Sequence, residues 1–341
     1  MKKIENNTKT NFFKKIFIKI CRLIGYEIID QNNFFVPTAN KSINETLSIQ
    51  GIKSINLPLG EVKITRAVKS MDIIIRTCAS VKMLTQNKAR IFEKEKIEYT
   101  LRSIKSILRS ILEAKKNHQN ISFKILIVDH NSSKENLNNI KQVLNHSNLD
   151  YKLFNLDVNE FTNRINHTNQ KNEQSTTNQV SNMCNIFKSL ELSKLADDLI
   201  YFVEDDYIHE NQSISEMIFA YERIASLTKN EIVICPTDYP YLYMKANDTN
   251  LFLGENYHWR KIEETLCTFL MSKQTVKKHW NKLTSMCTQE HYPFESPLHE
   301  IYREEMCISP VPSLAIHCTN INSAFGLSPN IDWKKLWDEN K

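Results

Sequence analysis

The chain has 341 residues, of which 41% are hydrophobic and 24% charged, so it is long enough to bury a sizeable core and has the composition of a soluble globular protein. Its formal net charge of +5 is small for this length and lysine is spread along the chain, which argues against a nucleic-acid-binding protein. The eight cysteines include no Cys-x-x-Cys pair, which argues against a zinc module. We expect a reducing, cytoplasmic location.

The N-terminal segment 11–29 carries a basic residue every three or four positions among Phe and Ile: Lys14, Lys15, Lys19 and Arg22. This spacing predicts a helix with one cationic and one broad apolar face, as in helices that lie in a membrane surface. The charges exclude the uninterrupted apolar core of a signal peptide, and no apolar run reaches the ~20 residues of a spanning helix. Two interpretations stay open: peripheral contact with the inner face of the cell membrane, or packing on the protein's own core.

Apolar runs alternate with amphipathic segments along the rest of the chain. The first half predicts strands that begin near residues 71, 123 and 151 and helices over 91–116 and 134–144. An almost purely polar stretch follows at 157–180. The second half predicts helices over 182–195, 213–228, 276–283 and 298–306, and strands over 199–203, 231–236, 267–273 and 311–318. Strands that alternate with helices indicate a parallel sheet with right-handed crossovers.

Three of the predicted strands end in polar residues: Arg76 and Thr77 after the first, Asp129 after the second, and Glu204 after 199–203. In open α/β sheets the ligand binds outside the carboxyl ends of the strands. We therefore expect these ends to converge on one crevice.

The carboxylates Glu204, Asp205 and Asp206 are adjacent and repel one another unless a cation or hydrogen-bond donors compensate. A hard divalent ion, Mn²⁺ or Mg²⁺, takes oxygen ligands and leaves positions open for substrate phosphates. The sequence favours this metal site over a solvated acidic turn or a helix cap.

The segment 128–133 places Asp129 where a carboxylate could accept from the edge of a nucleotide base, just before a helix N-terminus. Capping of that helix alone is the competing interpretation. The chain has only five glycines and no glycine-rich phosphate loop, which disfavours a dinucleotide-dependent dehydrogenase and a P-loop ATPase.

The strands DIIIRTCAS, ILIVDHNSS, YFVEDDYI and CTFLMSK, followed by a late strand with a histidine, resemble in this order a nucleotide-sugar glycosyltransferase of the GT-A fold, most similar to glycosyltransferase family 2. The resemblance covers about residues 71–318. It implies an α/β fold, a GT-A-like three-layer sandwich around a mostly parallel mixed sheet. The implied organisation is an extension over 1–70, the catalytic domain over 71–320 and a tail over 321–341.

The same resemblance implies an inverting transfer of a sugar from a nucleotide-diphosphate donor to a hydroxyl acceptor, with a divalent metal, Mn²⁺ or Mg²⁺, as cofactor. The amphipathic N-terminal segment would bring the enzyme to the membrane surface, so we expect a hydroxyl-bearing glycan or lipid-linked acceptor and a role in cell-surface glycan synthesis. The resemblance further implies that Asp206 binds the metal and that Glu204 or Asp205 contacts the ribose or the metal's water shell. Arg76 and Thr77 would line the nucleotide, and Asp129 would bind the base. His317 falls at the place of a late metal or diphosphate ligand, although a structural role is the alternative.

Inverting transfer needs a base that takes the proton of the acceptor hydroxyl. The resemblance places this base after the strand 267–273, and Glu300 is the first choice, with Glu295 next. The remaining candidates are His299, Glu304 and Glu305. Two other functions stay open, a non-catalytic GT-A-like protein that binds a nucleotide-sugar or glycan, and a nucleotidyltransferase.

Overall fold

The computed structural model describes residues 12–26, 28, 63–80, 90–244, 248–319 and 323–341. The chain forms two units, residues 1–63 and 64–341, and each is described by itself. None of the helices in the described ranges is long and apolar enough to cross a membrane.

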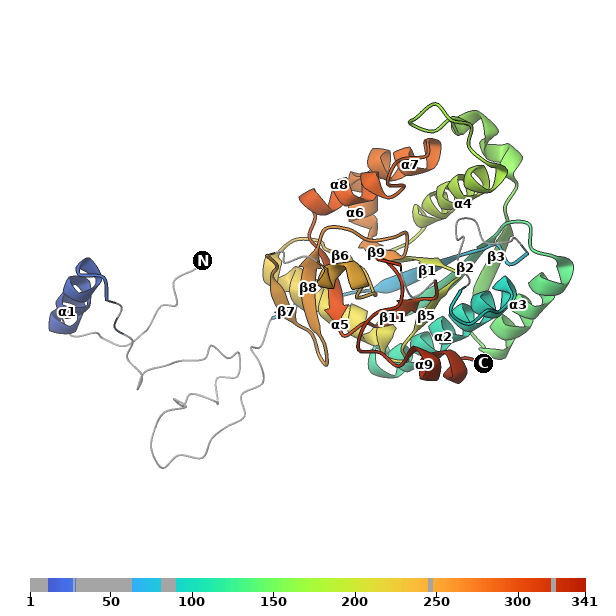
Figure 1. Cartoon of the computed structure of the whole chain (residues 1–341). Helices are drawn as coiled ribbons and strands as arrows, with labels where there is room; N and C mark the ends of the chain where they lie inside the picture. Colours follow the sequence, from blue (N-terminus) through green and yellow to red (C-terminus); the bar gives the residue numbers. More distant parts are fainter. Residues whose placement is uncertain (1–11, 27, 29–62, 81–89, 245–247, 320–322) are drawn as a thin grey trace. The chain divides into compact units, whose positions relative to one another are not determined.

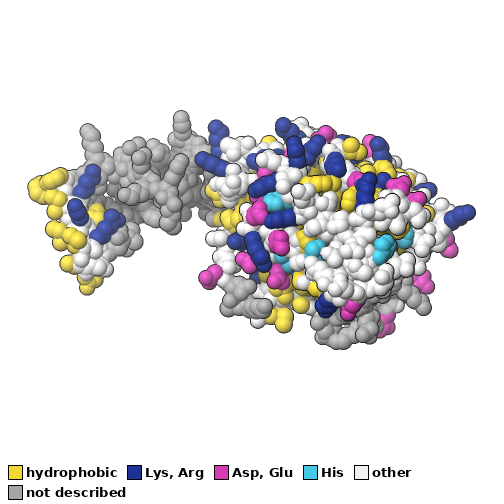
Figure 2. Space-filling model, turned by 90° about the horizontal axis from the view of Figure 1, so that it is seen from above, with side chains coloured by type: hydrophobic (Ala, Val, Ile, Leu, Met, Phe, Trp, Pro, Cys, Tyr) yellow, Lys and Arg dark blue, Asp and Glu magenta, His cyan; other side chains and the backbone are white. Residues whose placement is uncertain are grey.

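The first unit contains the helix α1 (Phe12–Leu23) within the segment 11–29 where a helix was predicted. Most apolar side chains of α1 are exposed, with 60% of Phe17 and 51% of Ile20 accessible to solvent, whereas Cys21 is buried. Figure 2 shows hydrophobic side chains gathered on one side of this helix and basic side chains on another. The predicted amphipathic character is therefore present in the structure.

The second unit is built on a nine-stranded mixed sheet. In spatial order its strands are β3 (Tyr151–Asn155), β2 (Ser122–Asp129), β1 (Ser70–Thr77), β4 (Leu199–Glu204), β9 (Phe269–Ser272), β6 (Val233–Ile234), β10 (Cys307–Val311), β8 (His258–Ile262) and β7 (Leu251–Leu253). The strands β3, β2, β1 and β4 are parallel, and β9 runs antiparallel to both of its neighbours. All eight residues of β1 are buried, as expected for a parallel strand that is covered on both faces.

Helices cover both faces of this sheet (Figure 1). One layer holds α4 (Thr177–Ser193), α6 (Lys273–Lys278), α7 (Trp280–Thr288) and α8 (Ser296–Glu304). The other holds α2 (Lys96–Asn117), α3 (Lys134–His146), α5 (Ser213–Thr228) and α9 (Trp333–Glu339). Two short 3-10 helices, η1 (Val158–Arg164) and η2 (Pro240–Tyr243), lie in the connections. The predicted class, a three-layer α/β sandwich around a mostly parallel mixed sheet, is confirmed.

A second sheet pairs β5 (Tyr207–His209) with β11 (Ala315–His317). The prediction of one strand over 311–318 is wrong, because β10 ends at Val311 and β11 belongs to this other sheet. Pro312 lies at the break, and a proline has no N–H to donate to a strand ladder. The separation allows β11 to cross toward the carboxyl end of β4.

Contacts of the second unit reach beyond residues 71–320. The unit begins at residue 64, and the side chain of Arg66 pairs with Asp198 at 2.5 Å and with Glu231 at 2.7 Å. At the other end, the expected tail contains α9, where Trp337 stacks on Phe92 with ring centroids 3.8 Å apart. Partly buried ionic contacts at one end and aromatic contacts at the other thus extend the packed domain.

Candidate active site

The carboxyl ends of β1, β2 and β4 lie side by side because the three strands are parallel and in register. Thr77 is opposite Asp129 across β1 and β2, and Arg76 is opposite Glu204 across β1 and β4. The predicted convergence of these strand ends is confirmed. They form the centre of the candidate active site.

The acidic turn follows β4 directly, with Asp205 and Asp206 between β4 and β5. β5 pairs with β11 so that Tyr207 lies opposite His317, and the N–H of Cys318 donates to the backbone carbonyl of Asp206 at 2.9 Å. The small second sheet therefore brings His317 beside the acidic turn, although the two are far apart in sequence.

The imidazole of His317 is held from three sides. Its ring stacks on Tyr207, with centroids 4.8 Å apart and planes inclined by 10°. Its Nδ1 lies 2.6 Å from the carbonyl oxygen of Phe325, which can only accept, so Nδ1 carries a proton. Its Nε2 faces Oδ2 of Asp206 at 3.5 Å. Burial alone would lower the pKa of His317, but Asp206 and Glu204 raise it above its ordinary value, which favours the imidazolium.

Each carboxylate of the acidic turn pairs with a basic side chain from another segment. The pairs are Glu204 with Arg76 at 3.1 Å, Asp205 with Lys96 at 3.0 Å and Asp206 with Arg90 at 3.0 Å. Burial alone would raise the pKa of Asp206, but His317 and Arg90 hold it far below its usual range. Asp206 is therefore an anion whose charge is compensated within the protein.

Asp205 is bonded to several groups of the protein and is buried. It is 5% exposed, and besides Lys96 it accepts from the hydroxyl of Thr100 at 2.8 Å and from the backbone N–H of Cys78 at 3.2 Å. These bonds connect the first turns of α2 to the loop after β1. Both of its oxygen atoms therefore have protein partners, and its contact with a nucleotide ribose stays a prediction.

Asp129 is likewise bonded inside the protein. Its Oδ1 accepts from the hydroxyls of Thr77 and Ser132, both at 2.6 Å, and its Oδ2 accepts from the N–H of Ser132 at 3.2 Å. The cap of α3 is a different residue, Ser133, which accepts from the N–H of Asn136. Asp129 is therefore not the cap of α3, and both of its oxygens accept hydrogen bonds within the protein. It does lie at the end of β2, where a contact with the nucleotide base was predicted.

The five candidate bases differ in burial and in their ion pairs. Glu295 is half-buried at the start of α8, where burial and the charge of Glu204 raise the pKa of its carboxyl to about 7. Glu300 is exposed on α8. Glu304 pairs with Lys282, Glu305 with Lys278 and His279, and His299 bonds the backbone of Thr265. Of the five, Glu295 is the one whose pKa is shifted by residues of the strand-end site.

The predicted metal ligands Glu204, Asp206 and His317 do not form a metal-binding group. Among the residues that the structure describes, no three His, Cys, Asp or Glu side chains are arranged to hold an ion. Glu204 and Asp206 instead each direct an oxygen at a guanidinium. The donor set therefore does not fit Mn²⁺ or Mg²⁺, which need several oxygens converging on one point.

Sequence reasoning missed Arg90 and Lys96. Lys96 carried a signal, because a cation in the first turn of a helix opposes the helix dipole and implies an anionic partner nearby. Arg90 carried none, because its pairing with Asp206 joins segments 116 positions apart.

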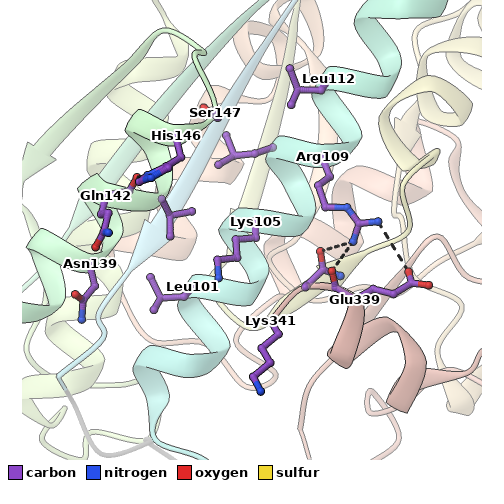
Figure 3. Close-up of a pocket in the computed structure, with 13 residues that line it drawn as sticks. Leu101, Lys105, Arg109, Leu112, Asn139, Gln142, His146, Ser147, Glu339 and Lys341 are labelled. Carbon is purple, nitrogen blue, oxygen red and sulfur yellow. Dashed lines mark hydrogen bonds and ion pairs between the residues drawn. The ribbon is translucent and has the colours of Figure 1, made fainter.

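A cavity of about 560 Å³ lies elsewhere, between α2, α3 and the C-terminal residues (Figure 3). Along α2 its lining is apolar at Leu101, Leu108 and Leu112 and basic at Lys105 and Arg109. Arg109 pairs with Glu339. None of the strand-end residues lines it, so this cavity is separate from the candidate active site.

No family model and no curated protein matches this sequence. Among solved structures, the chain is similar to an active-site mutant of LgtC, with 10% identity, 67% of this chain and 70% of that chain covered, and a TM-score of 0.34. It is similar to the glycosyltransferase GlyE of Streptococcus pneumoniae TIGR4, with 10% identity, coverages of 80% and 63%, and a TM-score of 0.39. It is also similar to mouse xyloside xylosyltransferase 1, with 11% identity, 69% of this chain and 76% of that chain covered, and a TM-score of 0.36. Similarities this low do not establish a shared activity, and the resemblance to glycosyltransferase family 2 stays a prediction.

Proposed function

We propose that this chain is a glycosyltransferase that moves a sugar from a nucleotide-diphosphate donor to the hydroxyl of a glycan or lipid-linked acceptor, with inversion. The observation that carries the proposal is Glu295. It is a half-buried carboxyl with a pKa of about 7, under the electrostatic influence of Glu204, Arg76 and His317 at the converged strand ends. A group poised near neutral pH is suited to accept a proton in the reaction.

In this proposal Glu295 accepts the proton of the acceptor hydroxyl as that oxygen attacks the anomeric carbon of the donor sugar. The bond between the sugar and the nucleotide diphosphate breaks in the same step, and the diphosphate leaves with the electron pair. Positive side chains at the strand ends stabilise the negative charge that develops on the leaving group. We assign this role to Arg76 and His317, which face Glu204 and Asp206 at the strand ends.

The nucleotide would lie over the ends of β1 and β2. Arg76 and Thr77 line this region, and Asp129 holds it in shape through its bond to Thr77. We assign the contact with the ribose to Glu204, because it is the most accessible member of the acidic turn, with 29% of its side chain exposed. Asp205 serves as an internal anchor. The proposal gives no step to Mn²⁺ or Mg²⁺, because the predicted ligands are paired with basic side chains.

The exposed apolar and basic side chains of α1 support a second part of the proposal, peripheral contact with the inner face of the cell membrane. Lipid-linked acceptors and growing cell-surface glycans would be available to the enzyme at that surface.

The proposal is tested by a hydrolysis and thermal-shift screen of UDP, GDP, CDP and their common sugars. We expect one nucleotide to stabilise the protein and its sugar to be slowly hydrolysed. Glu295→Gln should slow hydrolysis by ~10²- to 10⁴-fold while keeping nucleotide binding, and Glu300→Gln, on the exposed side of the same helix, should behave as wild type.

Two other results would replace the proposal. Binding without any hydrolysis or transfer would favour a non-catalytic nucleotide-sugar-binding protein. Formation of a nucleotide sugar from a sugar phosphate and a nucleoside triphosphate would favour a nucleotidyltransferase.

A further inference from the structure

Each carboxylate of the acidic turn is paired with a basic side chain of the protein. The three carboxylates face three basic side chains, each contributed by a different segment: Arg76 from β1, Arg90 from the segment before α2, and Lys96 from the first turn of α2. The nitrogen-oxygen distances of 3.0 to 3.1 Å are those of direct ion pairs. A divalent ion bound here would have to displace at least two of them.

Displacement would be unfavourable because the cations are buried. Arg76 has 7% of its side chain exposed, Arg90 11% and Lys96 19%. A guanidinium or ammonium that loses its carboxylate partner in such a place is left desolvated and unpaired. The ion would also need oxygens that converge, and no such group is present in the described part of the chain.

We infer that this site binds the diphosphate of its donor without a divalent ion, with Arg76, Arg90 and Lys96 in the ion's place. The inference rests on the proposed function, since it assigns the part of that site that meets the leaving group. The carboxylates of the turn then hold three cations in position and are not metal ligands.

The three cations keep donors for a phosphate. The ammonium of Lys96 has three N–H bonds and is paired with Asp205. One Nη of Arg90 bonds Asp206 and the other bonds the carbonyl of Cys318, and each Nη carries two N–H bonds. Guanidinium groups match the geometry of phosphate oxygens. A bound diphosphate could therefore share these cations with the carboxylates.

The first experiment concerns the metal alone. Binding of Mn²⁺ to the full chain is followed by electron paramagnetic resonance, without nucleotide, for wild type and Asp206→Asn. We expect no bound Mn²⁺ at concentrations up to about 0.1 mM, which means a Kd for the metal alone above about 0.1 mM. Mn²⁺ binding that Asp206→Asn removes would overturn the inference, whatever the function.

The second experiment measures binding of UDP, GDP, CDP and ADP by calorimetry, in EDTA and in Mn²⁺. We expect the Kd of the preferred nucleotide to agree within about threefold between the two conditions. Arg90→Gln should weaken binding at least ~10-fold, as for a lost hydrogen bond to a charged group, and Arg90→Lys should recover part of it. Arg109→Gln, which alters an arginine of α2 paired with Glu339 outside the site, should stay within about twofold of wild type.

The outcomes separate the two proposals. Binding that occurs in Mn²⁺ and disappears in EDTA would overturn the inference and leave the glycosyltransferase standing. Binding of no nucleotide under either condition, by folded protein, would overturn the proposed function and the inference with it. Unchanged affinity in Arg90→Gln would remove Arg90 from the diphosphate site.

Discussion

The hydroxyl of Thr77 donates a 2.6 Å hydrogen bond to Oδ1 of Asp129, and this bond joins the last residues of β1 and β2. Both residues are nearly inaccessible, with 1% of Thr77 and 3% of Asp129 exposed. A carboxylate so placed shapes the strand ends from within. Asp129, which was predicted to contact the nucleotide base, can therefore also act by fixing the positions of Thr77 and Ser132.

Asp129→Asn should lower the free energy of unfolding by about 1–3 kcal/mol, because an amide cannot accept all three hydrogen bonds that the carboxylate accepts. Urea unfolding measures this change. Asp150→Asn, an exposed aspartate before β3, is the control and should have no effect. A fully stable Asp129→Asn protein with weakened nucleotide binding would instead support the direct base contact.

The sheet could be predicted from the sequence because its central strands are self-evident apolar runs. β1, β2 and β4 are continuous β-branched or aromatic segments, and each stops at a polar residue. The convergence of Arg76, Asp129 and Glu204 follows from parallel register alone. Local pattern was sufficient for this part of the site.

The partners of the acidic turn could not be predicted in the same way. A run of three carboxylates requires compensation, but an ion and a set of basic side chains satisfy the same requirement. Whether an ion or basic side chains compensate the carboxylates depends on pairing between distant segments. The pair of Arg90 with Asp206 is one example, and no local sequence pattern predicts it. Glu295 and Glu300 are similarly indistinguishable by sequence, because their difference is burial.

The pH dependence of catalysis should report Glu295. Its raised pKa, about 7, leaves the carboxyl protonated and unable to act as base below neutral pH. We therefore expect kcat/KM to rise with pH through about 7 and then level off. In Glu295→Gln this rising part of the pH profile should disappear, and the rate should fall ~10²- to 10⁴-fold. Glu300→Gln should keep the rising part. A midpoint near the ordinary value of 4.5 would contradict the assignment.

The contribution of His317 to stability should fall as pH rises. The pKa of His317 is raised in the folded protein above the ordinary 6.5, so its pair with Asp206 stabilises fully below that value and is lost as pH passes through the folded-state pKa. The stability difference between wild type and His317→Gln should be larger at about pH 5.5 than at about pH 9. Urea titrations at both pH values, with the exposed His146→Gln as control, measure it. A difference that does not vary with pH would contradict the ion pair.

The start of the packed domain should lie at residue 64 and not at 71. Arg66→Met removes the partner of Asp198 and Glu231 and should cost about 2–3 kcal/mol, less than a fully buried pair because Arg66 is partly exposed. Arg109→Met, at an exposed pair, should change stability by less than ~0.5 kcal/mol. A chain that begins at 64 should unfold as the full chain does, whereas one that begins at 71 should be destabilised. Equal stability of the two shortened chains would contradict this boundary.

Peripheral membrane binding should depend on the apolar face of α1. Phe17→Ser combined with Ile20→Ser removes two exposed apolar side chains, each contributing about 1.5–3 kcal/mol if buried in the lipid interface. We expect the full chain to sediment with vesicles that contain anionic lipid, and the double variant to bind at least ~10-fold more weakly. Leu195→Ser is the matched control, because Leu195 is 73% exposed on the other unit and should not contribute.

The basic side chains of α1 allow a second test of membrane binding. Lys15, Lys19 and Arg22 on α1 predict weaker binding to neutral vesicles and weaker binding at high salt, since attraction to anionic headgroups is screened. Removal of residues 1–63 should abolish vesicle binding and leave hydrolysis of the nucleotide sugar in solution unchanged. If wild type and the double variant sediment equally, or neither sediments, the apolar face of α1 is not a membrane contact, and packing against protein becomes the better explanation of its amphipathic pattern.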